Sequence, residues 1–186
     1  MKTNFKKLVY SAVFAALACV CTMMIRIPTP ETSGYIHPGD AVVILSGVFL
    51  GPVYGGLAAG IGSMLADFFG GYMIYIPMTF VFKFGIAFTT GIIYRNLIAT
   101  KKTRQLAIFL GGIMDILFVV GAYTIVEIPL YTLAGALASV PAKFVQSIGG
   151  LVLASVLYPV LHAIPELNRM STESAKVKKA EVVDNK

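Results

Sequence analysis

Long stretches of this chain carry no charged side chain, and their length predicts helices that cross a membrane. The uncharged stretches are residues 41–66, 68–82, 84–94, 105–114, 116–126, 128–142 and 144–165. Such stretches are unfavourable in water and are typical of transmembrane segments. They do not alternate apolar and polar residues as the strands of a membrane β-barrel do, so we expect an all-α membrane protein.

The apolar stretches divide into six predicted spans. Residues 40–67 are long enough for one span or for a helical hairpin, and Pro52 favours the hairpin because proline suits the first turn of a helix. The second helix of the bundle, which ends at Leu50, is then short and is expected to tilt or to be buried in protein. The other spans are expected at about residues 5–25, 75–94, 106–126 and 137–161.

The distribution of basic residues supports this count. The hairpin places the lysine-rich N-terminus, the basic loop after residue 94 and the basic tail on one side of the membrane. The positive-inside rule assigns that side to the cytoplasm. We therefore expect a bundle of six transmembrane helices with both the N- and C-termini cytoplasmic.

Composition narrows the class further. Of the 186 residues, 57% are hydrophobic and 13% are charged, and the mean hydropathy is +0.81. Soluble domains average about 45–50% apolar and about 25% charged residues. Residues 1–165 are expected to form one membrane domain, and residues 166–186 a charged, disordered cytoplasmic tail. The net charge of +6 lies mostly in loops and tails, so we expect contact with the lipid bilayer and not with nucleic acid.

Ionisable side chains interrupt the apolar spans at Asp67, Lys83, Asp115, Glu127 and Lys143. An ionisable group inside a membrane span costs several kcal/mol, and its usual reason is function. The predicted topology places most of these groups in the outer half of the bundle. They are therefore expected to form a polar pocket that opens to the outside.

The residues expected around this pocket combine charges, hydrogen-bonding groups and aromatic rings. Thr79 lies one turn from Lys83, and Gln146 lies one turn from Lys143. This combination suits a flat heteroaromatic ligand, which stacks on rings and forms a few directed hydrogen bonds. The candidate substrate-binding residues are Asp67, Lys83, Thr79, Tyr75, Lys143, Gln146, Tyr35 and Asp40.

The same charged residues also have a purely structural interpretation. Buried charges need partners, and a pair of opposite charges can hold two helices together without any ligand. The structural alternatives are the ion pairs Asp67–Lys83 and Asp115–Lys143, and helix-end charges in water at Asp40 and Glu127.

No catalytic or metal-binding motif is present. The chain lacks HExxH, GxSxG and P-loop motifs, and Cys19 and Cys21 point in different directions from one helix. His37 lies in a loop, where a single histidine is usually a surface residue. We expect no enzyme activity, no cofactor and no metal, and any ATP hydrolysis must occur on another chain.

Small side chains follow one face of the first predicted helix, at Ala12, Ala15, Ala16 and Cys19. Such a face lets another helix approach closely, either within the bundle or on a separate membrane subunit. The glycines of the third helix, between residues 51 and 62, are expected to pack internally.

Several segments taken together resemble a known family. They are residues 28–40, which include Pro-Thr-Pro and Gly-Tyr-Ile-His-Pro-Gly-Asp, residues 50–56, residues 60–72, and residues 77–83 with Pro-Met-Thr-Phe-Val-Phe-Lys. The pattern resembles the substrate-binding membrane subunit, or S component, of energy-coupling factor (ECF) vitamin transporters. It is most similar to the branch that includes riboflavin, pyridoxine and hydroxymethylpyrimidine subunits.

The resemblance implies a multi-pass protein of the bacterial plasma membrane that binds a vitamin near its outer face, with the first outer loop as a lid. It also implies that Ala12 and Ala16 dock on a transmembrane coupling subunit driven by two cytoplasmic ATPases. Asp67 and Lys83 match polar sites of this branch. The favoured ligands are pyridoxine and hydroxymethylpyrimidine, with riboflavin next. The alternative functions are a stand-alone proton-coupled transporter and a structural subunit without a ligand.

Overall fold

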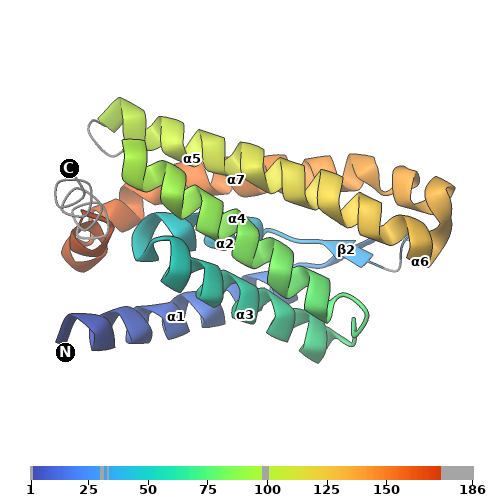
Figure 1. The fold of residues 1–186 in the computed structure, drawn as a ribbon, viewed down its shortest axis with the longest axis horizontal. Coiled ribbons are helices and arrows are strands. Elements are labelled where there is room, and N and C mark those ends of the chain that lie inside the picture. The colour runs from blue at the N-terminus through green and yellow to red at the C-terminus, as the bar shows by residue number, and fades with distance from the viewer. Residues whose placement is uncertain (1, 30–31, 33, 98–100, 173–186) are drawn as a thin grey trace, which may run out of the picture.

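The computed structural model describes residues 2–29, 32, 34–97 and 101–172. Helices form nearly all of this part, and a short antiparallel hairpin lies among the ends of the helices (Figure 1). The elements are α1 (Lys2–Met24), β1 (Ile27–Thr29), β2 (Gly34–Ile36), α2 (Asp40–Leu50), α3 (Pro52–Gly70), α4 (Ile76–Leu97), α5 (Lys101–Ile116), the π-helix η1 (Leu117–Ala122), α6 (Tyr123–Ala138) and α7 (Val140–His162).

Within the described residues, five helical stretches are long and apolar enough to cross a membrane. They are α1, α3, α4, the continuous stretch of α5, η1 and α6, and α7. The sixth apolar helix, α2, has only 11 residues, which is about 16 Å at 1.5 Å per residue. Nearly all of α2 is buried, and it packs against α3, α4 and α7. The short second helix therefore lies inside the protein and not against lipid.

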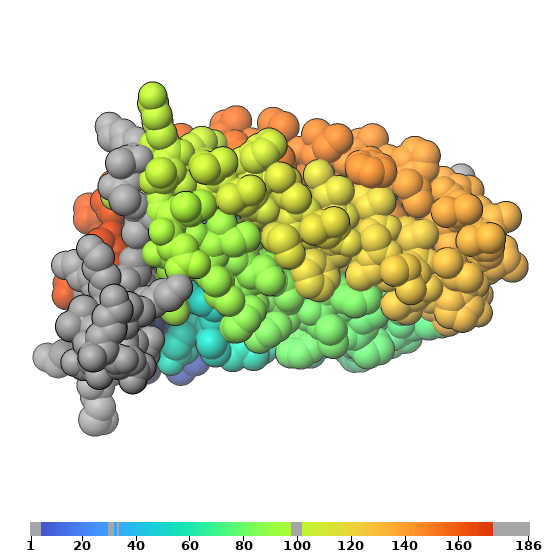
Figure 2. Space-filling view, turned by 45° about the horizontal axis from the view of Figure 1, so that its top comes forward, coloured from blue at the N-terminus to red at the C-terminus, as the bar shows by residue number. Residues whose placement is uncertain are grey.

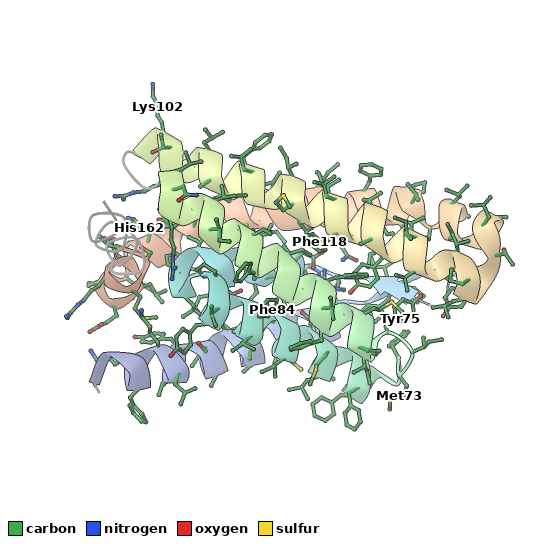
Figure 3. The ribbon with its side chains drawn as sticks, viewed as in Figure 1. Met73, Tyr75, Phe84, Lys102, Phe118 and His162 are labelled. Carbon is green, nitrogen blue, oxygen red and sulfur yellow. The ribbon has the colours of Figure 1, made fainter. Side chains whose placement is uncertain are left out.

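The start of α1 and the end of α7 lie at the same end of the bundle (Figure 1). His162 marks that end, and Met73 and Tyr75 mark the opposite end, where the chain turns from α3 into α4 (Figure 3). An even number of passes through the bundle produces this arrangement.

The break between α2 and α3 falls at the predicted position. Gly51 has φ +82°, a backbone conformation that residues with a Cβ rarely adopt, and Pro52 begins α3. The chain therefore reverses at Gly51 and Pro52, and residues 40–67 form a helical hairpin.

Glycines let α3 approach its neighbours closely. A Cβ at Gly62 would lie 2.3 Å from the carbonyl oxygen of Ala15 in α1, and a Cβ at Gly60 would lie 2.9 Å from the carbonyl oxygen of Phe80 in α4. These distances leave no room for a side chain. The glycine-rich face of α3 therefore packs inside the bundle, as expected.

The small residues of α1 do not all share one environment. Ala12 and Ala16 are exposed, whereas Ala15 and Cys19 are half-buried. The opposite face of α1, with Phe14 and Ala18, is buried in the protein. Ala12 and Ala16 therefore form the outward part of the predicted docking face.

Large apolar side chains cover the outside of the bundle. Figure 2 shows one lateral face, on which α4 and the stretch from α5 to α6 join without a visible opening. Leu117, Ile125 and Leu133 are each more than half exposed. Such a surface is suited to the hydrocarbon region of a bilayer.

Two segments differ from the sequence-based expectation. Residues 127–136 were expected to link two spans, but α6 continues through them to Ala138 and bends at Thr132, which has φ +82°. The segment is almost entirely apolar, so helix is favourable there despite Pro129. Residues 165–172 are helical, and Leu167 and Met170 belong to the buried core. The packed structure thus continues past the expected domain boundary at residue 165, and residues 173–186 of the expected tail lie outside the described residues.

Candidate ligand-binding site

A pocket lies toward the Tyr75 end of the bundle, between the hairpin and the helices α1, α3, α4, α6 and α7. Its empty space is about 570 Å³ with the open mouth included, and the centre of a water molecule can reach about 60 Å³ of it. One water molecule needs roughly 10–15 Å³ of space that its centre can reach. The 60 Å³ of such space in this pocket therefore has room for only a handful of waters.

Predicted binding residues from β2, α3, α4 and α7, together with Tyr75 just before α4, come together here. Tyr35, Asp67, Tyr75, Thr79, Lys83, Lys143 and Gln146 all line the pocket. Asp40 does not line it but lies directly behind Lys83 and Gln146 and bonds to both. The sequence therefore identified one wall of charged and aromatic groups, although it did not show which groups pair.

The hairpin covers the pocket and is held by hydrogen bonds to three helices or their ends. The Tyr35 hydroxyl donates to Asp67 Oδ1 at 2.7 Å, and the Tyr75 hydroxyl donates to the carbonyl oxygen of Thr32 at 2.7 Å. The backbone N–H of His37 donates to Gln146 Oε1 at 3.3 Å. Among the described residues, hydrogen bonds and not ion pairs therefore hold the cover of the pocket.

Lys83 and Asp40 form a fully buried ion pair between α4 and α2. The side chains are 2% and 0% exposed, and Gln146 Nε2 also donates to Asp40 at 2.7 Å. The alternative interpretation that Lys83 pairs with Asp67 is therefore wrong, and Asp40 is not a helix-end charge in water. Helix rotation explains this correction, because Asp40 faces into the bundle from the first turn of the buried helix α2.

Lys143 and Glu127 form a second ion pair, between α7 and α6. Lys143 Nζ also donates to the Thr124 hydroxyl at 2.9 Å, and the Tyr75 hydroxyl lies 3.2 Å from Glu127 Oε1. The alternative interpretation that Lys143 pairs with Asp115 is therefore wrong, and Glu127 is 2% exposed and not in water. The continuation of α6 past residue 126 accounts for both corrections, because it carries Glu127 inward opposite Lys143.

Asp115 lies outside the pocket lining and is fully buried. Neither of its carboxyl oxygens has a hydrogen-bond partner within the described residues. It interacts electrostatically with the buried pair of Lys83 and Asp40 and lies near Ser147. Asp115 is therefore neither a direct pocket residue nor a member of an ion pair in the described part of the chain.

Aromatic rings gather at the mouth of the pocket. The rings of Tyr35 and Tyr72 lie 4.5 Å apart, and the Arg26 guanidinium lies 5.1 Å from the centre of the Tyr35 ring. Deeper in the site, the Tyr123 hydroxyl donates to the Thr79 hydroxyl at 2.8 Å. Tyr72 thus packs on the hairpin.

Sequence reasoning missed a set of lining residues from the first helix, the hairpin and the helix interiors. Ser63 is a short polar residue in an apolar helix, which is a weak signal, and Thr22 stands near the end of an apolar run. His37 was placed at the surface because a single histidine in a loop is usually a surface residue. The lining residues not predicted as ligand contacts include Thr22, Thr29, Thr32, His37, Ser63, Val119, Tyr123, Glu127 and Ser139.

Two buried hydroxyls of the lining are unpaired. Thr22 Oγ1 and Ser63 Oγ have no hydrogen-bond partner among the described residues. A buried hydroxyl without a partner is unfavourable by about 1–3 kcal/mol. These two groups are therefore available to a polar ligand or to water.

The charges of the pocket nearly cancel. Lys83 and Lys143 are each paired with an acid, and Asp67 is bonded to a phenol. Burial, together with the neighbouring Asp67 carboxylate, raises the pKa of Tyr35, so this phenol stays protonated and donates. Within the described residues no group of three or more His, Cys, Asp or Glu side chains could hold a metal ion.

Apolar helices around an enclosed polar pocket define a multi-pass membrane protein with a binding site for a small molecule. Residues 2–163 match the family described as the ECF-type riboflavin transporter S component. The chain therefore belongs to this family of membrane transporter subunits, which are not enzymes and whose partners are a vitamin ligand and an ECF module.

Similar proteins span nearly the same length. The chain is 30% identical over 166 residues, 89% of this chain and 93% of the relative, to the thiamine precursor transporter HmpT of Lactococcus lactis subsp. cremoris strain MG1363. It is 34% identical over 142 residues, 76% of this chain and 92% of the relative, to an uncharacterised protein in the gap 3′ region of Pyrococcus woesei. A solved S component of a bacterial ECF transporter has the same fold, with a TM-score of 0.62 and 21% identity over 86% of this chain and 97% of the other.

Proposed function

We propose that this chain binds a small vitamin precursor from outside the cell and delivers it for ATP-driven uptake. The observation that carries the proposal is the enclosed pocket, which is lined by aromatic rings and near-cancelling charges under a hydrogen-bonded hairpin. A purely structural subunit has no need of such a cavity. The buried ion pairs are then the walls of a binding site and not its whole purpose.

The proposed ligand is hydroxymethylpyrimidine, with pyridoxine as the close alternative. The thiamine precursor transporter of L. lactis, a relative that covers most of the chain, supports this choice. The chemistry of the pocket supports it too, because both compounds are small, flat and uncharged enough for a site whose charges are already paired. Asp67 would accept from an amine or a hydroxymethyl group, and the rings would stack on the heterocycle.

Riboflavin is the second candidate, because the matching family carries its name. Riboflavin is much larger than either single-ring compound. The enclosed part of the pocket holds only a handful of waters, so a three-ring ligand would require the hairpin and helices to move apart. The smaller ligands fit the closed structure better.

We further propose six passes with both termini in the cytoplasm, which the common end of α1 and α7 supports. The exposed Ala12 and Ala16 would meet the transmembrane coupling subunit, and two ATPases on the cytoplasmic side would drive transport. A helix can approach this face of α1 closely because its side chains are small.

Titration of the purified subunit tests the ligand. We expect saturable binding of hydroxymethylpyrimidine or pyridoxine, measured by calorimetry in detergent, and weaker binding of riboflavin. Mass spectrometry of the ligand that remains bound through purification provides an independent measurement. Tight binding of riboflavin or of an acidic vitamin, with no binding of hydroxymethylpyrimidine or pyridoxine, would show that the proposed ligand is wrong. An absence of binding to all of them would contradict the proposed function itself.

A further inference from the structure

His37 lines the pocket, and a hydrogen bond from the backbone fixes the roles of its two ring nitrogens. The backbone N–H of Gly39 donates to His37 Nδ1 at 3.1 Å. A nitrogen that accepts a hydrogen bond carries no proton, so the neutral ring must carry its proton on Nε2. The backbone of the same loop therefore selects the tautomer of this histidine.

The Nε2–H group is a donor without a partner in the described part of the chain. Among the described residues, His37 forms hydrogen bonds only through its backbone N–H and through Nδ1. The residue lines the pocket and is only half-buried. A buried or half-buried donor in a pocket lined by polar groups is positioned to serve a ligand.

The surroundings of His37 keep the ring neutral and in place. Burial lowers its pKa to about 4; the nearby Asp40 opposes this effect, and Lys83 and Arg26 add to it. Protonation would put a hydrogen on Nδ1 against the Gly39 N–H. The Tyr35 ring packs on the imidazole with the ring centres 5.4 Å apart, and the His37 backbone is held by Gln146. The donor is thus presented from a fixed ring at neutral pH.

The hydrogen bond to His37 Nδ1 requires a glycine at position 39. A Cβ at residue 39 would lie 2.2 Å from Thr22 Oγ1 and 2.9 Å from His37 Nδ1. Only glycine brings its N–H to the imidazole while the loop stays against α1. The loop sequence His37-Pro38-Gly39 is therefore explained by the orientation of the histidine.

We propose that His37 is a specificity-determining residue, whose Nε2–H donates a hydrogen bond to an aromatic ring nitrogen of the bound ligand. The inference rests on the proposed function, because it concerns the same pocket and its heterocycle. Among the residues that line the pocket, both lysines have acidic partners, whereas His37 has a free N–H. A neutral donor also discriminates between ligand rings with a nitrogen that accepts its hydrogen bond and rings that carry a C–H group in the same place.

Two substitutions of His37 distinguish its proposed contact with the ligand from its structural role as the acceptor for the Gly39 N–H. In His37→Gln, the side-chain amide N–H can occupy the place of Nε2–H, but the acceptor for Gly39 is lost. In His37→Asn, the side-chain oxygen can replace Nδ1 as the acceptor for Gly39, but the donor to the ligand is lost. Affinities for hydroxymethylpyrimidine are measured by calorimetry for the wild-type chain and both variants, with thermal stability in detergent as the folding control.

We expect His37→Asn to weaken binding about 5- to 150-fold, which is the usual effect of leaving a buried polar group unpaired, and His37→Gln to retain most of the affinity. The wild-type chain should also prefer hydroxymethylpyrimidine over a pyridine analogue that has C–H at the contacted ring position, and His37→Asn should lose this preference. Equal binding by the Asn variant and the wild type, or equal loss in both variants, would overturn the inference. If the wild-type chain binds none of the single-ring compounds, the proposed function fails first and this inference fails with it.

Discussion

Removal of the Lys83 charge should destabilise the whole bundle and not only weaken ligand binding. The Lys83 side chain is 2% exposed and pairs with Asp40, which is 0% exposed. In Lys83→Met, the Asp40 carboxylate keeps only the hydrogen bond from Gln146 Nε2 at 2.7 Å. Lys83 also attracts the buried Asp115 and the pocket residue Asp67. A single substitution therefore removes the cation nearest to several buried carboxyl groups.

The size of the effect follows from the cost of an uncompensated buried charge. Breaking one partner of a buried ion pair typically costs about 3–5 kcal/mol of folding free energy. We expect Lys83→Met to lose most of that amount, seen as a lower midpoint of thermal denaturation of the purified subunit in detergent. A matched variant on the lipid face, Val81→Met, should leave the midpoint unchanged, because Val81 is 58% exposed on the same helix.

The double variant Asp40→Asn with Lys83→Met tests the cause. It removes both charges and keeps an acceptor for Gln146, so most of the lost stability should return. If Lys83 also contacts the ligand, the double variant stays stable but binds the ligand more weakly. A Lys83→Met chain as stable as the wild type would refute the reasoning, because the two charges would then not depend on each other.

Three further predictions follow from the fold. In a cysteine-free background, a cysteine at Met73 should react with a membrane-impermeant reagent added to intact cells, and one at Lys102 should not, because the two positions lie at opposite ends of the bundle (Figure 3); labelling of the second would contradict cytoplasmic termini. Ala16→Leu should prevent copurification with the coupling subunit and leave ligand affinity unchanged, and loss of affinity with intact copurification would show that this face packs internally. Gly62→Ala should lower thermal stability because its Cβ would lie 2.3 Å from the Ala15 carbonyl oxygen, whereas Gly149→Ala, with nothing within 4 Å, should be neutral.

The fold was largely predictable because a bilayer imposes strong rules on sequence. Apolar length identified the long helices, and Gly51 followed by Pro52 marked the break of the helical hairpin. The continuation of α6 beyond residue 126 was not predictable from apolarity, because an apolar segment with a proline reads equally well as a loop or as a bent helix. Thr132 takes the bend, and nothing in the local sequence distinguishes it from its neighbours.

The members of the site were predictable, but their partners were not. Ionisable residues in apolar spans stand out in a sequence, so Asp67, Lys83 and Lys143 were identified directly. Their pairing depends on how each helix is rotated and on how far it extends, which the packing of the whole bundle decides. Residues such as Ser63 and Thr22 carry no charge and therefore gave no comparable signal, although they line the same pocket.

Different interactions hold the helices and the hairpin of the site in place, and this difference indicates which part moves when a ligand enters. The two ion pairs, Lys83 with Asp40 and Lys143 with Glu127, join helices to helices and stay buried. The hairpin is attached by hydrogen bonds, such as the one between Tyr35 and Asp67 and the one from Tyr75 to the carbonyl oxygen of Thr32. A hydrogen bond contributes about 0.5–1.5 kcal/mol net between neutral groups and about 1.5–3 kcal/mol where one partner is charged, because water replaces it when it opens. Separating a buried ion pair costs about 3–5 kcal/mol. Entry by movement of the hairpin is therefore the less costly route, and the charged wall can remain in place to receive the ligand.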